Sequence, residues 1–134
     1  MAVQYSVAVR NAMLDAIETT TGVSAKLAIY TGSAPANCAA AATGTLLATL
    51  TLPSDWMAAA SAGTKALTGT WQASAGAAGT AGYYRITDNA GTTCHEQGTV
   101  TATAGGGDIT LDNTSIANAQ VVTITSKTIT AGNA

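Results

Sequence analysis

The chain has 134 residues, a net charge of −2 and only 9% charged residues, which suits one domain and is short for two. Its five Lys and Arg residues are scattered without a basic run, so we expect no nucleic-acid-binding function. The uncharged stretch 27–54 contains Thr, Ser, Gly and Pro throughout. It does not have the composition of a transmembrane helix, and we expect no membrane contact.

The apolar residues are mostly small. Although 47% of the residues are hydrophobic, the chain has no Phe, and Leu, Ile and Val together number 22. A core of small side chains stabilises a fold less than one of large side chains. We therefore expect a marginally stable domain that gains stability by contact with a partner or with copies of itself.

Residues 6–21 are predicted to form the one helix of the chain. Apolar side chains recur on one face at helical spacing, at Val9, Ala12, Met13, Ala16 and Ile17. Ser6 is a suitable N-cap and Gly22 a suitable stop. Polar residues occupy the opposite side, at Arg10, Asn11, Asp15 and Glu18.

Leu14 lies off the apolar stripe, between Arg10 and Glu18 on the polar side. It is either a tolerated surface leucine, as many proteins have, or a residue through which the helix contacts a partner. The second interpretation makes Leu14 a candidate protein–protein contact residue.

After the helix, short segments of alternating apolar and polar residues predict about seven strands between residues 24 and 130. They are predicted at 27–31, 46–52, 65–73, 83–88, 92–101, 109–111 and 121–130. Asp88-Asn89-Ala90-Gly91 is a turn sequence, so the strands on either side of it should form a hairpin. The parity of apolar positions changes between Ile124 and Ile129, which indicates a bulge in the last strand.

One helix followed by closely spaced strands, without β-α-β alternation, predicts a mainly β fold. We expect an antiparallel β-sandwich or jelly roll with one N-terminal α-helix, in a single domain over residues 1–134.

Cys94-His95-Glu96 is the one cluster of potential metal ligands in the sequence. On a strand, His95 points to the opposite face from Cys94 and Glu96, and zinc needs three or four convergent ligands. We therefore expect no metal and no cofactor. Cys38 and Cys94 are expected to be free thiols, because no secretory signal is visible and the protein is expected to be made in the cytoplasm.

No residue constellation in the sequence predicts an enzyme. His95 is the only histidine, and a Ser or Thr nucleophile needs a base and a residue that orients it. Asp108 and Asp112 flank a short strand and could form a carboxylate pair, but aspartates at strand ends commonly belong to turns. A small hydrolase domain would have to use His95 or Asp108.

Trp56 follows a loop sequence and is the second candidate contact residue, because Trp is enriched at binding hot spots. A carbohydrate-binding platform is the competing interpretation of the aromatic residues, and it requires several exposed rings.

Several stretches carry a family resemblance, and together they span most of the chain. They are Arg10-Asn11-Ala12-Met13-Leu14-Asp15, Leu27-Ala28-Ile29-Tyr30-Thr31-Gly32 followed by Pro35-Ala36, Gly79-Thr80-Ala81-Gly82-Tyr83-Tyr84-Arg85-Ile86, Leu111-Asp112-Asn113-Thr114-Ser115-Ile116 and Val122-Thr123-Ile124-Thr125. These stretches resemble small virion proteins of tailed bacteriophages, and in particular the capsid cement (decoration) proteins of short-tailed Bordetella-type phages.

The resemblance implies a jelly-roll cement protein that forms a homodimer. Such a protein is made in the host cytoplasm and binds the outer surface of an icosahedral capsid, where it clamps neighbouring subunits of a major capsid protein with the HK97-type fold. The alternative function is a tail-fibre or receptor-binding module that recognises a glycan of the host surface. That alternative predicts clustered exposed aromatic side chains and a trimer.

Overall fold

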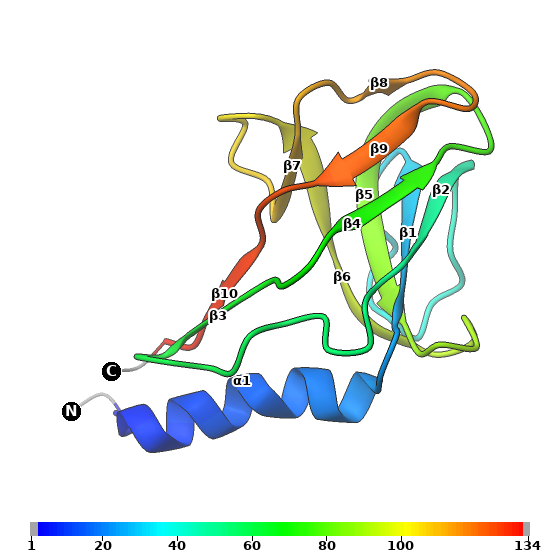
Figure 1. Ribbon diagram of the computed structural model, residues 1–134. Helices are drawn as coiled ribbons and strands as arrows, with labels where there is room; N and C mark the ends of the chain where they lie inside the picture. Colours follow the sequence, from blue (N-terminus) through cyan, green and yellow to red (C-terminus); the bar gives the residue numbers. More distant parts are fainter. Residues whose placement is uncertain (1–2, 133–134) are drawn as a thin grey trace.

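The computed structural model describes residues 3–132, which form one helix and ten strands (Figure 1). The helix α1 is Val7–Thr21. The strands are β1 Lys26–Thr31, β2 Leu46–Thr51, β3 Thr64–Ala66, β4 Trp71–Ser74, β5 Gly79–Thr87, β6 Cys94–Ala102, β7 Ile109–Leu111, β8 Ser115–Ile116, β9 Val121–Ile124 and β10 Thr128–Thr130. No helix within this range has both the length and the apolar composition that a membrane span requires.

The strands form two layers around the core. The main sheet has the order β2-β1-β5-β6-β7, and β8 pairs with β5. The short sheet β4-β9 lies across it, with β4 against β2 and β9 against β7 (Figure 1). The prediction of a mainly β sandwich with one N-terminal helix is therefore confirmed, and so is the β5–β6 hairpin around the turn at residues 88–91.

The pair β6–β7 is parallel, which the sequence did not predict. The chain folds back over Thr101 through a glycine-rich loop between the two strands. A Cβ atom at Gly105 or Gly107 would lie 2.7–2.8 Å from the Thr101 side chain, so this tight loop between two parallel strands depends on glycine at both positions.

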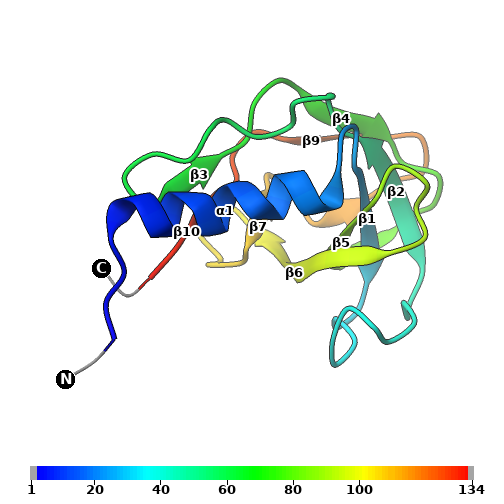
Figure 2. The ribbon, with the colours of Figure 1, turned by 90° about the horizontal axis from the view of Figure 1, so that it is seen from below.

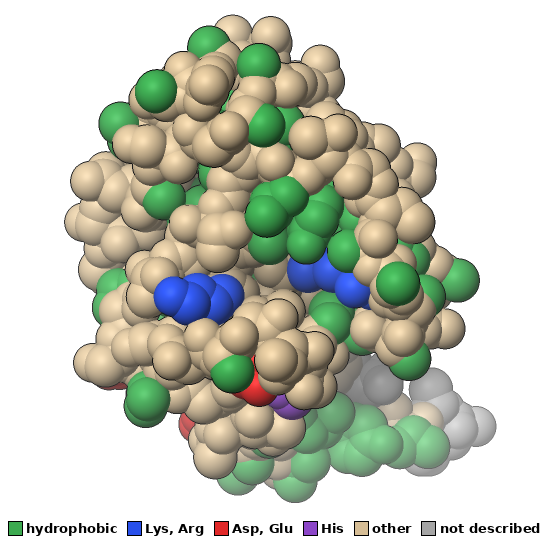
Figure 3. Space-filling view, turned by 90° about the vertical axis from the view of Figure 1, so that its right-hand side faces the viewer, with side chains coloured by type: hydrophobic (Ala, Val, Ile, Leu, Met, Phe, Trp, Pro, Cys, Tyr) green, Lys and Arg blue, Asp and Glu red, His purple; other side chains and the backbone are tan. Residues whose placement is uncertain are grey.

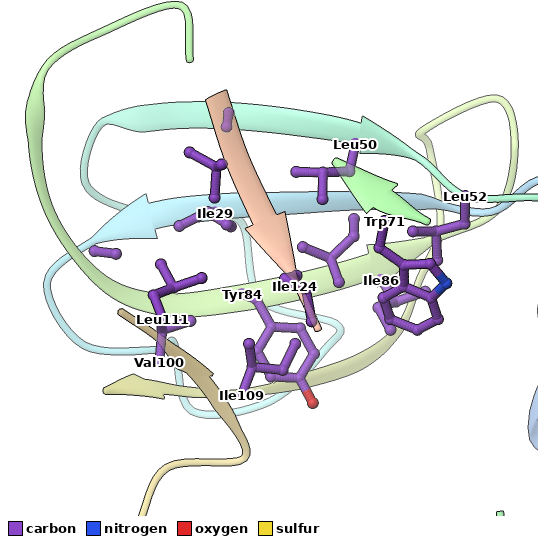
Figure 4. Packing of buried hydrophobic residues seen from close by; sticks show 14 of the residues in the cluster. Ile29, Leu50, Leu52, Trp71, Tyr84, Ile86, Val100, Ile109, Leu111 and Ile124 are labelled. Carbon is purple, nitrogen blue, oxygen red and sulfur yellow. The ribbon is translucent and has the colours of Figure 1, made fainter. Parts of the chain in front are cut away.

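The core lies between the two layers and contains larger side chains than the composition led us to expect. Trp56, Trp71 and Tyr84 are buried there together with leucines and isoleucines of the main sheet and with Ile124 of β9. Figure 4 shows part of this packing. The rings of Trp56 and Trp71 have centroids 5.9 Å apart. The few large side chains of the sequence are thus gathered in one place.

Two predicted long strands, 65–73 and 121–130, are each broken in the structure. Residues 64–66 pair with residues 128–130 as β3–β10, and residues 71–74 pair with residues 121–124 as β4–β9. Between these ladders, four residues (67–70) lie opposite three (125–127), because Ala66 pairs with Thr128 and Trp71 pairs with Ile124. The irregularity predicted between Ile124 and Ile129 is present, but the extra residue is on the opposite strand.

The outer side of the main sheet is covered by the loop 32–45, which connects β1 to β2. Tyr83 holds one end of this loop: its hydroxyl donates to the Thr43 carbonyl (2.5 Å) and accepts from the Thr43 N–H (3.0 Å). The Tyr83 ring stacks on Tyr30, with centroids 5.1 Å apart. The loop is therefore a packed covering of the sheet.

Helix α1 begins and ends as predicted. The Ser6 side chain accepts a hydrogen bond from the Val9 N–H (3.3 Å), and the Gly22 N–H donates to the Glu18 carbonyl (2.9 Å) at the other end. The helix lies along the segment that leads into β3, at the β3–β10 end of the molecule (Figure 2). Of the five residues in the apolar stripe read from the sequence, however, only Ile17 packs against the core, and the other four are exposed.

The side of α1 that faces the protein is mainly polar. Asn11, Asp15 and Glu18 accept hydrogen bonds from the backbone N–H groups of Gly63 (2.9 Å), Ala60 (2.9 Å) and Met57 (3.1 Å), respectively. Three backbone donors of the segment 57–63 are thereby satisfied by side chains of the helix, whereas the N–H groups of Ala58 and Ser61 donate to carbonyls of β3. Arg10 donates to the Ala131 carbonyl (3.0 Å) beside this segment.

Gly63→Ala should lower the free energy of unfolding more than Gly91→Ala does. Both glycines have positive φ (+74° and +76°), where alanine costs about 1–2 kcal/mol. A Cβ atom at Gly63 would also lie 2.1 Å from the Arg10 guanidinium, whereas nothing lies within 4 Å at Gly91. We expect about 1–2 kcal/mol of additional loss at Gly63, because Arg10 must leave Ala131. Urea denaturation of both variants measures this difference, and equal losses would contradict it.

Candidate functional site

The two contact residues proposed from the sequence, Leu14 and Trp56, are both buried. Leu14 is 3% exposed and Trp56 is 0% exposed, and the Trp56 Nε1–H donates to the Gly22 carbonyl (3.0 Å) at the end of α1. Their assignment as partner-contact residues is therefore corrected: both are buried within the folded chain, and Trp56 binds the C-terminal end of α1. The sequence pattern assigned Leu14 to the surface because it shares a side of the helix with Arg10 and Glu18. In the structure that side of the helix faces the protein.

A different surface becomes the candidate site, because the apolar stripe of α1 faces outward. Val9 is 44% and Met13 51% exposed, and Ala12, Ala16 and Thr20 are exposed on the same side. We call these five residues the outer helix face. It contains no charged side chain.

The segment before the helix extends this apolar surface. Val3, Tyr5 and Val7 are exposed by 66%, 40% and 50%, so five of the eight exposed large hydrophobic side chains of the described residues lie between positions 3 and 13. Figure 3 shows hydrophobic side chains gathered along the lower edge of the molecule, at the height where α1 lies in Figure 1. Exposed apolar residues concentrated in this way are typical of protein–protein contact sites.

The acidic side chains of α1 are turned toward a buried cation, although the Asp15 side chain itself stays 47% exposed. The Lys65 ammonium donates to Asp15 (2.8 Å) and to the Ala58 carbonyl (2.9 Å), and it forms an ion pair with Glu18 (3.0 Å). Burial opposes the charge on Lys65, but the hydrogen bonds to Asp15 and Glu18 outweigh it and hold the pKa of the ammonium above its usual value. The helix orientation is therefore fixed by a buried cation.

A shallow hollow of about 260 Å³ adjoins the outer helix face. It is lined by Met13, Ala16, Ile17, Thr20, Thr21 and His95. His95 is exposed at the start of β6 and, of the three potential ligands Cys94, His95 and Glu96, is the one that lines this hollow. An apolar side chain of a partner could enter this hollow.

The other two residues of that cluster lie on opposite sides of the main sheet. Cys94 contacts Cys38 in the loop 32–45, whereas Glu96 pairs with Lys127 (3.0 Å) on the core side. The sequence placed Cys94 and Glu96 on the same face, and this was wrong because the register shifts between them, at His95. Among residues 3–132 there is no group of three His, Cys, Asp or Glu side chains that could hold a metal ion.

Asp108 has a structural role in the described chain. Its carboxylate accepts hydrogen bonds from the Thr99 N–H and hydroxyl (both 2.9 Å), and the Thr99 N–H lowers the pKa of this carboxyl. These bonds tie the start of β7 to β6. Asp112 lies exposed at the opposite end of β7, in keeping with the prediction that both aspartates belong to strand ends.

A second buried cation, Lys127, lies on the core side of β6. The Lys127 ammonium donates to the Tyr84 hydroxyl (2.8 Å) and to Glu96 (3.0 Å), next to a hollow of about 420 Å³. Burial, followed by the charges of Glu96 and Asp108, raises the pKa of Tyr84 far above its usual value. Tyr84 therefore stays protonated and serves as a hydrogen-bonding group that joins β5 to the segment before β10.

In comparisons with known proteins, no family model matches this chain, and neither a curated protein nor a solved structure shows significant similarity to it.

The contribution of Asp15 to stability should be lost in acid. The Lys65 ammonium, and then the Ala60 N–H, lower the pKa of the Asp15 carboxyl below 3.8 in the folded protein. A group with a lowered folded-state pKa stabilises the fold above its unfolded pKa, and this contribution disappears as the pH falls through the folded-state pKa. The urea midpoint of the wild type should therefore exceed that of Asp15→Asn at pH 6, and the difference should shrink as the pH falls below 3.8. A gap that is unchanged at low pH would contradict this explanation.

Proposed function

We propose that this protein is a structural protein of a bacteriophage virion. In this proposal it binds the outside of an icosahedral capsid and cements neighbouring major capsid subunits with the HK97-type fold. It acts as a homodimer that is made in the host cytoplasm and added to the assembled head. The role requires binding surfaces and uses neither a catalytic residue nor a cofactor.

The observation that carries the proposal is the outer helix face. An ordinary surface helix turns its charges to water and its apolar stripe inward. Helix α1 instead turns Asp15 and Glu18 toward Lys65 and leaves most of its apolar stripe exposed. The result is an apolar, uncharged surface around Val9 and Met13 in contact with water. Covering this surface with another protein removes apolar area from water and stabilises the assembly.

We assign the outer helix face to a second copy of this chain. A two-fold interface brings the same patch of both subunits together, so the patch must be complementary to itself. A face without charge meets its copy without electrostatic repulsion. Ala12 and Ala16 are exposed on it, and small side chains allow two helices to approach closely.

The resemblance to phage cement proteins supplies the second partner, the capsid lattice. A subunit that binds only the assembled lattice stabilises it by mass action. A dimer doubles the number of lattice contacts per particle, and linked contacts bind much more tightly than single ones. The alternative glycan-binding module needs a cluster of exposed rings, whereas Trp56, Trp71, Tyr83 and Tyr84 are buried in this structure.

Met13→Glu should weaken the dimer by at least about tenfold, because it places like charges opposite each other in a two-fold interface. Val121→Glu is the matched control, since it adds the same charge at an apolar position that is 56% exposed but lies on β9. Sedimentation equilibrium of the three proteins measures the dissociation constants. A wild-type protein that stays monomeric, or equal constants for both variants, would contradict the assignment.

The purified protein should bind saturably to expanded phage heads that lack it. Co-sedimentation over a range of protein concentrations measures this binding, with unexpanded heads as the comparison because they present a different lattice. Absence of binding to expanded heads, together with a trimer that binds host-surface glycan, would instead support the receptor-binding module.

A further inference from the structure

The two cysteines, 56 positions apart in the sequence, meet on the outer side of the main sheet. Cys38 belongs to the loop 32–45 and Cys94 is the first residue of β6. Their Sγ atoms are 2.8 Å apart, and both residues are half-buried free thiols. A disulfide needs an S–S distance of about 2.05 Å, so the sulfurs have to approach by less than ~1 Å.

The loop is held in place on both sides of Cys38. The Arg85 guanidinium donates from Nη2 to the carbonyls of Asn37 (3.0 Å) and Ala40 (2.7 Å). The Gln97 side chain donates to the Pro35 carbonyl (2.7 Å). The approach of the two thiols is therefore part of the packed structure, in which Arg85 and Gln97 of the sheet fix the loop that carries Cys38.

The surroundings of Cys94 favour its neutral thiol. Burial, and then the hydrogen bond to Cys38, raise the pKa of the Cys94 thiol well above its usual value. The Cys94 sulfur also lies 3.3 Å from the Glu96 carbonyl oxygen. Because the thiolate is the reactive form, the reaction of Cys94 with an added disulfide oxidant is slow at neutral pH and faster at higher pH.

We propose that Cys38 and Cys94 are a redox pair that forms an intramolecular disulfide under oxidising conditions and thereby ties the loop 32–45 covalently to β6. This inference rests on the geometry of the two thiols and is independent of the proposed function.

The oxidant we consider is a small linear disulfide, such as oxidised glutathione. One cysteine loses its proton and attacks a glutathione sulfur, which forms a mixed disulfide and releases one glutathione thiolate that takes up the proton. The second cysteine, also deprotonated, attacks the protein sulfur of the mixed disulfide and releases the second glutathione, which is protonated in turn. The two cysteines are oxidised by two electrons, and one glutathione disulfide is reduced to two thiols.

The new bond should stabilise the protein, because it closes a long loop and restricts the unfolded chain. The native geometry needs little change to accommodate it. We expect the oxidised protein to melt about 10 °C above the reduced protein.

The test is incubation of the full chain with oxidised glutathione at pH 7 and pH 9, followed by thiol titration in denaturant and intact-mass analysis. We expect both thiols to disappear, faster at pH 9, with a mass loss of two hydrogen atoms and no retained glutathione. The melting temperature should rise with the loss of thiols and return after reduction.

Two single variants serve as controls. Cys38→Ser, in the loop, and Cys94→Ser, on β6, should each retain one glutathione as a mixed disulfide and show no comparable rise in melting temperature. The proposal is overturned if the wild-type protein retains glutathione, keeps two free thiols after prolonged oxidation at pH 9, or forms disulfide-linked dimers instead.

Discussion

The buried ammonium of Lys65 is the interaction on which the arrangement of the helix depends. A Lys side chain that is only 3% exposed is tolerated when each of its three N–H groups finds an acceptor, and Asp15, Glu18 and the Ala58 carbonyl provide them. Two of these acceptors are on α1, so the polar side of the helix has to face the protein. The apolar side is then left to the solvent or to a partner, which is why the candidate site lies there.

The same rule governs the other buried cations. Three of the five Lys and Arg side chains are buried, namely Lys65, Arg85 and Lys127, with exposed fractions of 3%, 7% and 5%. Arg85 binds loop carbonyls on one side of the main sheet, and Lys127 binds Tyr84 and Glu96 on the other. Each cation fastens an irregular segment to a regular element. Charge that most proteins place on the surface is used here inside, and the surface is correspondingly poor in charge.

A surface of this kind is suited to assembly. Uncharged, apolar patches pay little desolvation cost when they are covered, whereas paired surface charges would have to lose water first. The outer helix face and the loop 32–45 lie at different places in the molecule and are fixed by different cations, Lys65 and Arg85. Association through the helix and oxidation at the loop therefore depend on different buried cations, although His95, next to Cys94, lines the hollow beside the outer helix face.

The sequence by itself determined the class of the fold and the limits of its clearest elements. Ser6 and Gly22 mark the helix, and Asp88 to Gly91 marks the hairpin, because caps and turns depend on local backbone chemistry. The tertiary structure alone decided which side of α1 is buried, that Trp56 completes the core, that β3–β10 and β4–β9 are separate ladders, and that Cys94 and Glu96 lie on opposite sides of the sheet. Reading the helix by hydrophobic periodicity assumes that its buried side meets apolar groups. Here, besides the core contact of Ile17, that side meets backbone N–H groups of the segment 57–63 and a buried ammonium, which only residues distant in sequence bring to it.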